Sequence, residues 1–419
     1  MGGYSASWSA RIEGCMESLN SNLYVFGGYD ISVEIADTWI SINSGENWAQ
    51  TAYYEDGTKA ILLDEDNGKF EGETYFAPRD GCPYCKHIDN GTEYAYITGA
   101  GNIVGSMGTE VWRTADGTNW EFLCAGQLIS NQTGAMISFG GKLWSLGGYD
   151  NNGAGYTNYI YCSEDGGYTW LRKNNANWGG RRGHRAFVLS DHLYITGGDG
   201  TGGWHNDVWR YDTLADGSGT DSWTDVSPSS AYPARSFLGS GVISGRVYIF
   251  GGASTGWTTW YDTMYSWAEG EANWTYESSF PLPTPMNLNM CAEKDNKIFI
   301  YGGLGQSWTP YYNTVYTFDG STAWSLNPNT PTFEARQGGG FVNLNGNFLQ
   351  YAGHNGTNPI ADCWISTDDC DSWTRTYLYD VTKCSGAITT GGKDLSAEFT
   401  TDKNGNTRTV WSIGCYNKT

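Results

Sequence analysis

VYIFGG, residues 247–252, is a short apolar run that ends in a pair of glycines, and this pattern decides the fold of the chain. Six close variants occur, at residues 23–28 (LYVFGG), 96–100 (YITGA), 143–148 (LWSLGG), 193–198 (LYITGG), 298–303 (IFIYGG) and 348–353 (FLQYAG). From the third copy onward they recur about every 50 residues, each followed by an aromatic-rich strand and a tryptophan turn. The sequence therefore predicts one repeat architecture.

Composition favours an all-β chain. Glycine accounts for 58 of the 419 residues, proline for 11 and aromatic residues for 15%, and no run shows sustained helical periodicity. A chain of this length often forms several domains, but continuous repeats stack on their neighbours. We therefore expect a single domain over residues 1–419.

Several turns carry a specific family resemblance. Residues 206–212 (NDVWRYD) leading to Trp223, and residues 313–319 (NTVYTFD) leading to Trp324, resemble kelch repeats. Other repeats end in turns that resemble the Asp-box of sialidase-like propellers, at residues 163–170 (SEDGGYTW), 41–48 (SINSGENW), 114–120 (TADGTNW) and 366–373 (STDDCDSW). The resemblance implies a β-propeller of four-stranded antiparallel blades, in which these motifs build the blades rather than an active site.

The repeats place seven complete blades along the chain. We assign them to residues 15–50, 79–123, 135–173, 183–226, 235–276, 286–325 and 336–375. Pairing residues 384–415 with residues 4–9 would join the N- and C-terminal strands in an eighth blade and remove open strand edges. We favour eight blades, with seven blades and an outer tail as the alternative. Residues 51–78 are an acidic insertion between blades, expected to form a surface loop or small hairpin.

Charge and segment patterns bear on partners and location. A net charge of −21 and a pI near 4.5 disfavour nucleic-acid binding, which needs clustered Lys and Arg. No apolar stretch is long enough to span a bilayer, and the N-terminus lacks signal-peptide features. Ten cysteines and glycosylation sequons at Asn90, Asn131, Asn273, Asn355 and Asn417 suit an oxidising compartment. We expect an extracellular or virion-surface location, with a cytoplasmic origin left open.

Three cysteine pairs are candidates for bonding. Cys384 and Cys415 flank the proposed closing blade, and Cys363 and Cys370 lie on either side of one hairpin. Cys82 and Cys85 form a CxxC motif near His87, which favours a short-range disulfide or free thiols over zinc, because no second ligand pair follows.

We expect no cofactor, although calcium is an alternative for one acidic loop. Asp64, Asp66 and Gly68 alternate there, but no bidentate Glu follows at EF-hand spacing, so a hydrated turn is favoured. A kelch-type copper oxidase would need paired histidine ligands, and the five histidines show no ligand spacing: His87, His184, His192, His205 and His354.

Four arginines recur near the first strand of successive blades and are expected to point toward the central channel: Arg79, Arg182, Arg235 and Arg336. In a sialidase-like hydrolase such a cluster would clamp a carboxylate. The favoured interpretation is that they bond buried carbonyls at the channel, and we expect no enzyme.

The loops after the glycine pairs offer aromatic side chains on one face of the predicted propeller. Flat rings with a polar handle suit sugars and peptides. The candidate ligand-binding residues are Tyr149, Tyr156, Trp204, His205, Trp257, Trp260, Tyr261, Trp308, Tyr311 and Tyr312. The sequence thus favours a non-enzymatic recognition propeller for glycan or protein partners, as a surface, virion or fibre component within a larger assembly. The alternative is a structural subunit without a ligand.

Overall fold

The computed structural model describes six strands between residues 15 and 71, and residues 79–99, 109–124, 126–128, 131–150, 154–173, 175–212 and 222–378. The chain divides into two compact units, Met1–Thr74 with Leu378–Thr419, and Tyr75–Tyr377. The described elements of both units are almost all strands, and the described residues contain no α-helix, as the sequence predicts. The fold is all-β.

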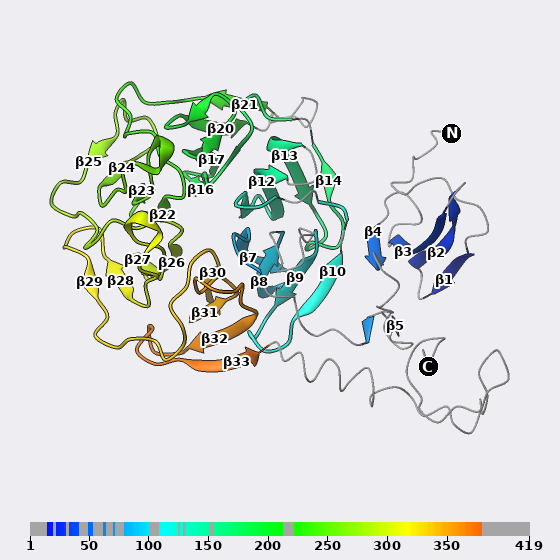
Figure 1. The fold of residues 1–419 in the computed structure, drawn as a ribbon. Coiled ribbons are helices and arrows are strands. Elements are labelled where there is room, and N and C mark those ends of the chain that lie inside the picture. The colour runs from blue at the N-terminus through cyan, green and yellow to red at the C-terminus, as the bar shows by residue number, and fades with distance from the viewer. Residues whose placement is uncertain are drawn as a thin grey trace. The chain divides into compact units, whose positions relative to one another are not determined.

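The unit Tyr75–Tyr377 contains six described four-stranded antiparallel sheets, arranged as the blades of a propeller (Figure 1). The first three sheets consist of β7 (Tyr84–Asp89), β8 (Thr92–Thr98), β9 (Val111–Thr114) and β10 (Glu121–Cys124); β11 (Ala135–Phe139), β12 (Lys142–Asp150), β13 (Gly155–Ser163) and β14 (Leu171–Arg172); and β16 (Arg185–Leu189), β17 (His192–Thr196), β20 (Val208–Asp212) and β21 (Ser222–Asp225).

The other three sheets repeat this order. They consist of β22 (Gly239–Ile243), β23 (Arg246–Phe250), β24 (Met264–Trp267) and β25 (Thr275–Tyr276); β26 (Met290–Lys294), β27 (Lys297–Tyr301), β28 (Val315–Phe318) and β29 (Ser325–Leu326); and β30 (Gly340–Leu344), β31 (Asn347–Tyr351), β32 (Asp362–Ser366) and β33 (Thr374–Leu378). Shorter elements are β15 (Arg181–Arg182), β18 (Asp199–Gly200) and β19 (Gly203–Trp204), which form a three-stranded sheet, and the 3-10 segments η1 (Thr255–Trp257) and η2 (Gln306–Trp308).

The other unit contains one more four-stranded sheet and a two-stranded one. The first is formed by β1 (Cys15–Leu19), β2 (Asn22–Asp30), β3 (Val33–Ser41) and β4 (Ala49–Ala52). Within the acidic insertion, β5 (Leu62–Leu63) pairs antiparallel with β6 (Phe70–Glu71).

A closed circle of backbone hydrogen bonds joins the six sheets of Tyr75–Tyr377. Just before each first strand, one residue donates its N–H to the equivalent carbonyl of the preceding blade, and Cys82 N–H closes the circle on the Gly338 carbonyl, with N–O distances of 2.7–3.3 Å. We call its members the mouth ring: Gly81, Thr133, Gly183, Phe237, Leu288 and Gly338. All six have positive φ, between 49° and 64°. The blades are thus tied together at one end of the central channel.

This closure bears on the predicted blade number. The last sheet bonds directly to the first, since Tyr351 donates its hydroxyl to the Tyr96 carbonyl at 3.0 Å and Thr376 donates to the Gly117 carbonyl at 2.7 Å. The circle therefore has six blades and leaves no gap, and the eight-blade ring over residues 1–419 is not confirmed. The proposed closing segments, residues 4–9 and 384–415, lie outside the described residues.

The glycine pair serves this closure, as Gly251 and Gly252 illustrate. Their φ values are 65° and 88°, and the Gly252 N–H donates to the Met286 carbonyl of the next blade at 2.8 Å. A Cβ on Gly252 would lie 2.8 Å from the Ser236 carbonyl oxygen. Only glycine fits such close backbone contact with a left-handed conformation.

The tryptophan that ends each repeat packs between neighbouring sheets. Trp223 lies 5.9 Å from Trp178 and belongs to the same buried cluster as Trp144, and Trp324 lies 5.2 Å from Phe250, centroid to centroid. Each indole therefore belongs to the core rather than to a surface.

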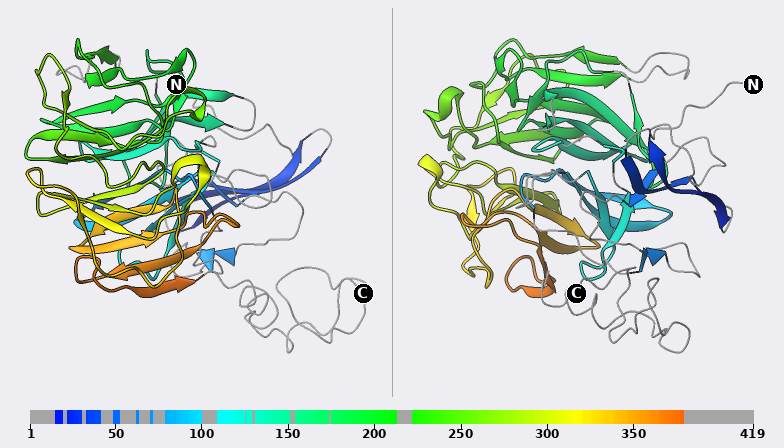
Figure 2. Two further views of the ribbon diagram at one scale, coloured as in Figure 1. Left: turned by 60° about the vertical axis from the view of Figure 1, so that its left-hand side comes forward. Right: turned by 45° about the vertical axis from the view of Figure 1, so that its right-hand side comes forward.

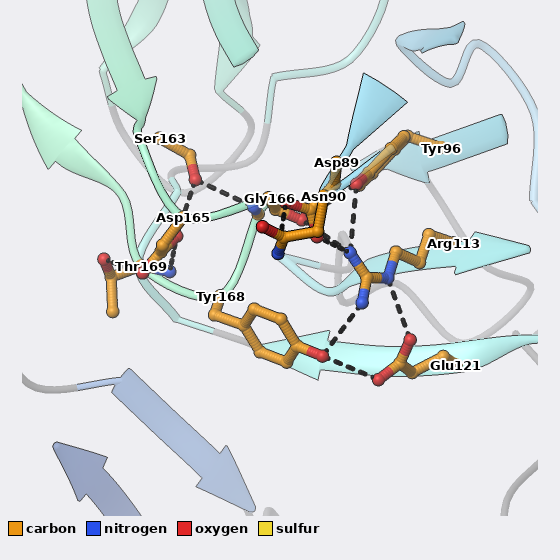
Figure 3. A network of polar contacts seen from close by, with 11 residues as sticks. Asp89, Asn90, Tyr96, Arg113, Glu121, Ser163, Asp165, Gly166, Tyr168 and Thr169 are labelled. Carbon is orange, nitrogen blue, oxygen red and sulfur yellow. Dashed lines mark hydrogen bonds and ion pairs between the residues drawn. The ribbon is translucent and has the colours of Figure 1, made fainter. Parts of the chain in front are cut away.

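The turn at residues 163–170 has the side-chain bonds expected from its sequence. Asp165 accepts hydrogen bonds from the Thr169 backbone and hydroxyl at 2.9 and 2.6 Å, and the Gly167 N–H donates to Ser163 Oγ at 2.8 Å. Beside this turn the buried Arg113 donates to Asp89 (Figure 3). Asp165 thus stabilises its own turn, and Asp89 pairs with Arg113 within the first sheet.

The cysteine pairing predicted within the last sheet is wrong. Cys363 and Cys370 are unbonded and buried on opposite faces: Cys363 points toward Gly117 of the first sheet, and Cys370 packs with Met290 of the preceding one. Cys82 and Cys85 are also unbonded, which is the free-thiol alternative. Cys384 and Cys415 lie outside the described residues, as do Asp64, Asp66 and Gly68 of the calcium alternative.

Candidate functional site

The loops that follow the second strands emerge at the same end of the propeller as the mouth ring, because each glycine pair bonds to the segment that enters a first strand. We call this end the loop face and define it by residues 197–207, 251–263, 302–314 and 352–361. The segments η1 and η2 belong to it and lie side by side (Figure 2). The predicted aromatic residues are mostly on these loops.

Four tryptophans from three blades form one cluster on the loop face. The Trp257 ring lies 5.2 Å from Trp204, 6.3 Å from Trp260 and 4.8 Å from Trp308, centroid to centroid. Trp260 is buried, whereas Trp308 is 48% exposed although it is a large apolar side chain. Such an exposed indole on a packed base is typical of a contact surface.

Beside the tryptophan cluster a cavity of about 170 Å³ opens over the mouth ring. We call it the cup. Its lining includes the rings of Trp257, Trp308 and Phe237 and four further members of the mouth ring. It also includes the polar residues that directly precede four mouth-ring residues: Asp80, Gln132, Arg182 and Gln337. The cup thus joins apolar rings to charged and amide groups.

The cup is shallow because side chains cross the channel below it. Arg185 donates from β16 to the Leu238 and Asn289 carbonyls at 2.5 and 3.0 Å. Tyr84 accepts from the Cys291 N–H at 3.2 Å. Beyond these side chains a channel of about 560 Å³ is lined by the six first strands.

Arg182 lines the cup with its charge neutralised. Its Nε lies 3.4 Å from Asp199 Oδ2, and its guanidinium carbon lies 5.3–5.6 Å from the ring centroids of Tyr149, Tyr156 and Phe237. Tyr156 donates its hydroxyl to the same Asp199 oxygen at 2.9 Å. Tyr149 and Tyr156 therefore surround an ion pair.

The remaining predicted ligand residues lie apart from the tryptophan cluster or at its edge. Tyr261 stacks on the buried Arg235 at 4.0 Å, and Tyr312 shares a hydrogen bond with Thr284 at 2.9 Å. Tyr311 packs at the edge of the tryptophan cluster. Burial lowers the pKa of His205, whose ring neighbours Arg181. The structure thus assembles half of the candidate set.

The channel arginines are committed to the fold. Arg235 and Arg336 each donate Nη1 to the carbonyl 16 residues ahead, at 3.0 and 3.2 Å, and Arg79 pairs with Glu110. Arg181, not Arg182, is the equivalent residue, because it donates to the Gly197 carbonyl at the same spacing. The predicted register was therefore wrong by one residue, and these arginines are used in bonds within the blades.

Sequence reasoning missed three polar residues of the cup, Asp80, Gln132 and Gln337. Asp80 and Gln337 each directly follow a channel arginine, so this position was a usable signal. Burial raises the pKa of Asp80, and nearby His354 opposes the rise. The described residues give its carboxylate no side-chain hydrogen bond or ion pair, and Gln337 Oε1 is buried without a partner among them. The cup therefore presents unsatisfied acceptors.

The described part of the chain has neither a metal-binding cluster nor a helix that could cross a membrane. No group of three or more His, Cys, Asp or Glu side chains is arranged to hold a metal ion there. Within the same residues, none of the helical segments has the length and apolar character needed to cross a membrane.

Comparisons with known proteins find similarity to kelch-repeat proteins. Residues 133–322 match the model of the KLHDC2/KLHL20/DRC7 Kelch-repeats domain. Kelch domain-containing protein 3 of Bos taurus is 26% identical over 181 residues, covering 40% of this chain and 46% of that protein. Kelch domain-containing protein 1 of Mus musculus is 26% identical over 273 residues, covering 54% and 64%.

The chain spans about half the length of the first curated relatives that it matches. A solved structure described as "Structure of YjhT" has a TM-score of 0.58 at 15% identity, over 73% of this chain and 99% of that one, which is a likeness of fold alone. Together with the propeller geometry, these matches support kelch repeats over residues 133–322.

Proposed function

We propose that this protein is a non-enzymatic recognition propeller whose loop face binds a protein partner. The observation that carries the proposal is the tryptophan cluster beside the cup, in which side chains from three blades converge and leave Trp308 48% exposed. Aromatic anchors next to a pocket are typical of the centre of a protein interface. Kelch repeats in this chain support the same class of function.

A protein segment fits this surface better than a glycan does. Sugars stack on flat, free ring faces, but Trp204 meets Trp257 at 79° and Trp260 meets Trp308 at 88°. The indoles therefore use much of their area on one another and present edges, with a single cup for an inserted side chain. An extracellular or virion-surface location and membership of a larger assembly stay predictions.

The channel arginines support a non-enzymatic role. A carboxylate clamp needs guanidinium groups free to meet a substrate. Arg235 is instead buried and bonded to backbone carbonyls, and Arg336 is paired with Asp362. Their chemistry is that of blade closure.

The test is a binding screen on the purified chain and on a Trp204→Ala, Trp257→Ala, Trp308→Ala variant, with a displayed peptide library and a glycan array. We expect peptides that bind the wild type and lose binding in the triple variant, while circular dichroism shows an intact fold. Glycan binding that the variant loses would replace the protein partner by a sugar. Binding that the variant retains would refute the placement of the site.

A further inference from the structure

We infer that the cup receives a cationic side chain, arginine or lysine, from the partner segment. This inference rests on the proposed function and names the chemistry of the group that the loop face recognises. Three independent features carry it: an unpaired carboxylate, a buried acceptor without a donor, and aromatic rings at the rim.

The unpaired carboxylate is that of Asp80. It lines the cup, and no other described side chain bonds or pairs with it. Withdrawing a carboxylate from water without a counter-ion is unfavourable, so burial raises the pKa of Asp80. A bound cation would supply the missing counter-ion.

The buried acceptor is Gln337 Oε1, which has no donor among the described residues. A guanidinium or ammonium group carries several N–H donors and no acceptor, so it matches a site made of acceptors. An anionic or purely acceptor ligand would leave both groups unsatisfied, at a cost comparable to a lost hydrogen bond each. The polarity of the cup therefore selects a donor.

The rim adds apolar contact. Trp257 and Trp308 line the cup, where they can pack against the methylene stem of a long cationic side chain. The one cation already present, Arg182, is paired with Asp199 and enclosed by Tyr149 and Tyr156, so its charge is compensated within the fold.

Other groups around the cup agree with this assignment. His354 and Tyr311 are the titratable groups whose charges couple to Asp80, and both come from loops of neighbouring blades. The net charge of −21 attracts basic segments over a longer range. A volume of about 170 Å³ suits the tip of one long side chain rather than a folded element.

Isothermal titration calorimetry with two capped amino acids tests the inference. N-acetyl-arginine amide carries the guanidinium, and N-acetyl-citrulline amide is its neutral isostere. We expect the arginine probe to bind at least about tenfold more tightly, and added salt to weaken it, as for a charge-assisted contact. Equal affinities, or no heat from the arginine probe, would overturn the inference.

Two variants locate the contact. Asp80→Asn keeps the shape and removes the charge, so binding of the arginine probe should fall to that of the citrulline probe. Asp295→Asn, at an exposed hairpin away from the loop face, should bind like the wild type. Trp308→Ala, a change at an exposed position, should also weaken the arginine probe. An Asp80→Asn protein that binds it normally would contradict the inference.

The outcomes separate this inference from the proposed function. If peptides captured by the loop face lose binding in the tryptophan variant but not in Asp80→Asn, the recognition face stands and the cationic group is wrong. If neither change affects peptide binding, both are wrong.

Discussion

Asp362→Asn tests how the buried arginines hold the blades. Arg336 is fully buried and meets both oxygens of Asp362, with Nη2–Oδ2 at 3.1 Å, and Trp364 donates its indole N–H to Oδ2 at 2.8 Å. The substitution keeps the size of the side chain but leaves the guanidinium without its counter-ion. Breaking one partner of a buried pair costs about 3–5 kcal/mol. Arg235 forms no ion pair with a carboxylate among the described residues, and burial lowers its pKa to about 10.

The matched control is Asp212→Asn, which removes the carboxylate that pairs with Arg210. Those side chains are 26% and 31% exposed, so the loss should stay below about 1 kcal/mol. Thermal unfolding followed by circular dichroism measures the melting temperatures of both variants. A loss of 1 kcal/mol lowers the melting temperature by about 2–4 °C in domains of 150–250 residues, and by less in larger ones. Asp362→Asn should lower the midpoint by several degrees more than the control. Equal shifts would refute the argument that the buried pair ties the blade to its loop.

Three further predictions follow from the mouth ring, the cup and the network of Figure 3. In urea unfolding, Gly338→Ala should lower the free energy of unfolding more than Gly346→Ala. Both glycines have positive φ, but only a Cβ at position 338 would lie against the backbone, 3.0 Å from the Gly81 nitrogen. Equal losses of unfolding free energy in the two variants would argue against the mouth ring. Because burial raises the pKa of Asp80, the stability of the fold decreases as pH rises through that pKa. The Asp80→Asn variant should therefore have a higher melting temperature than the wild type at pH 7, and the difference should vanish below the usual pKa of 3.8. A lower melting temperature of the variant at pH 7 would contradict this. Tyr168→Phe should cost about 1–3 kcal/mol in the same urea assay, since its hydroxyl links Arg113 and Glu121 at 2.9 and 2.8 Å, and an unchanged midpoint would show that the link is idle.

Local features of the fold could be predicted because single residues report them. The glycine pairs mark the ends of second strands, since only glycine fits the backbone contact seen at Gly252. The terminal tryptophans mark the fourth strands, as Trp223 and Trp324 do. Four-stranded antiparallel blades follow from these marks.

Closure could not be predicted, because it depends on which sheets meet. The repeats predict seven complete blades and cannot say that β30 lies against β7, a contact between segments about 250 residues apart, as in the bond from Tyr351 to Tyr96. Arg182 was predicted in place of Arg181 for a simpler reason: the two arginines are adjacent in the sequence. Only the spacing of 16 residues between the arginine and its carbonyl acceptor distinguishes them, and it selects Arg181.

The sequence predicted which residues lie on the loops of the site, but not how those loops converge. Loop position identified Trp204, Trp257 and Trp308 as candidates, but their convergence depends on the backbone of η2, where Ser307 and Trp308 have positive φ. Asp80 was one acidic residue among many, and only the mouth ring shows that it faces the cup.

The most direct test of the recognition face is site-specific photo-cross-linking in the native source. A photoreactive phenylalanine derivative placed at Trp308 is compared with the same group at Leu326, which is similarly exposed, at 51%, but lies on the outer strand β29. The account predicts a discrete cross-linked partner from position 308 and none from position 326. A partner captured from position 326 and not from position 308 would contradict it.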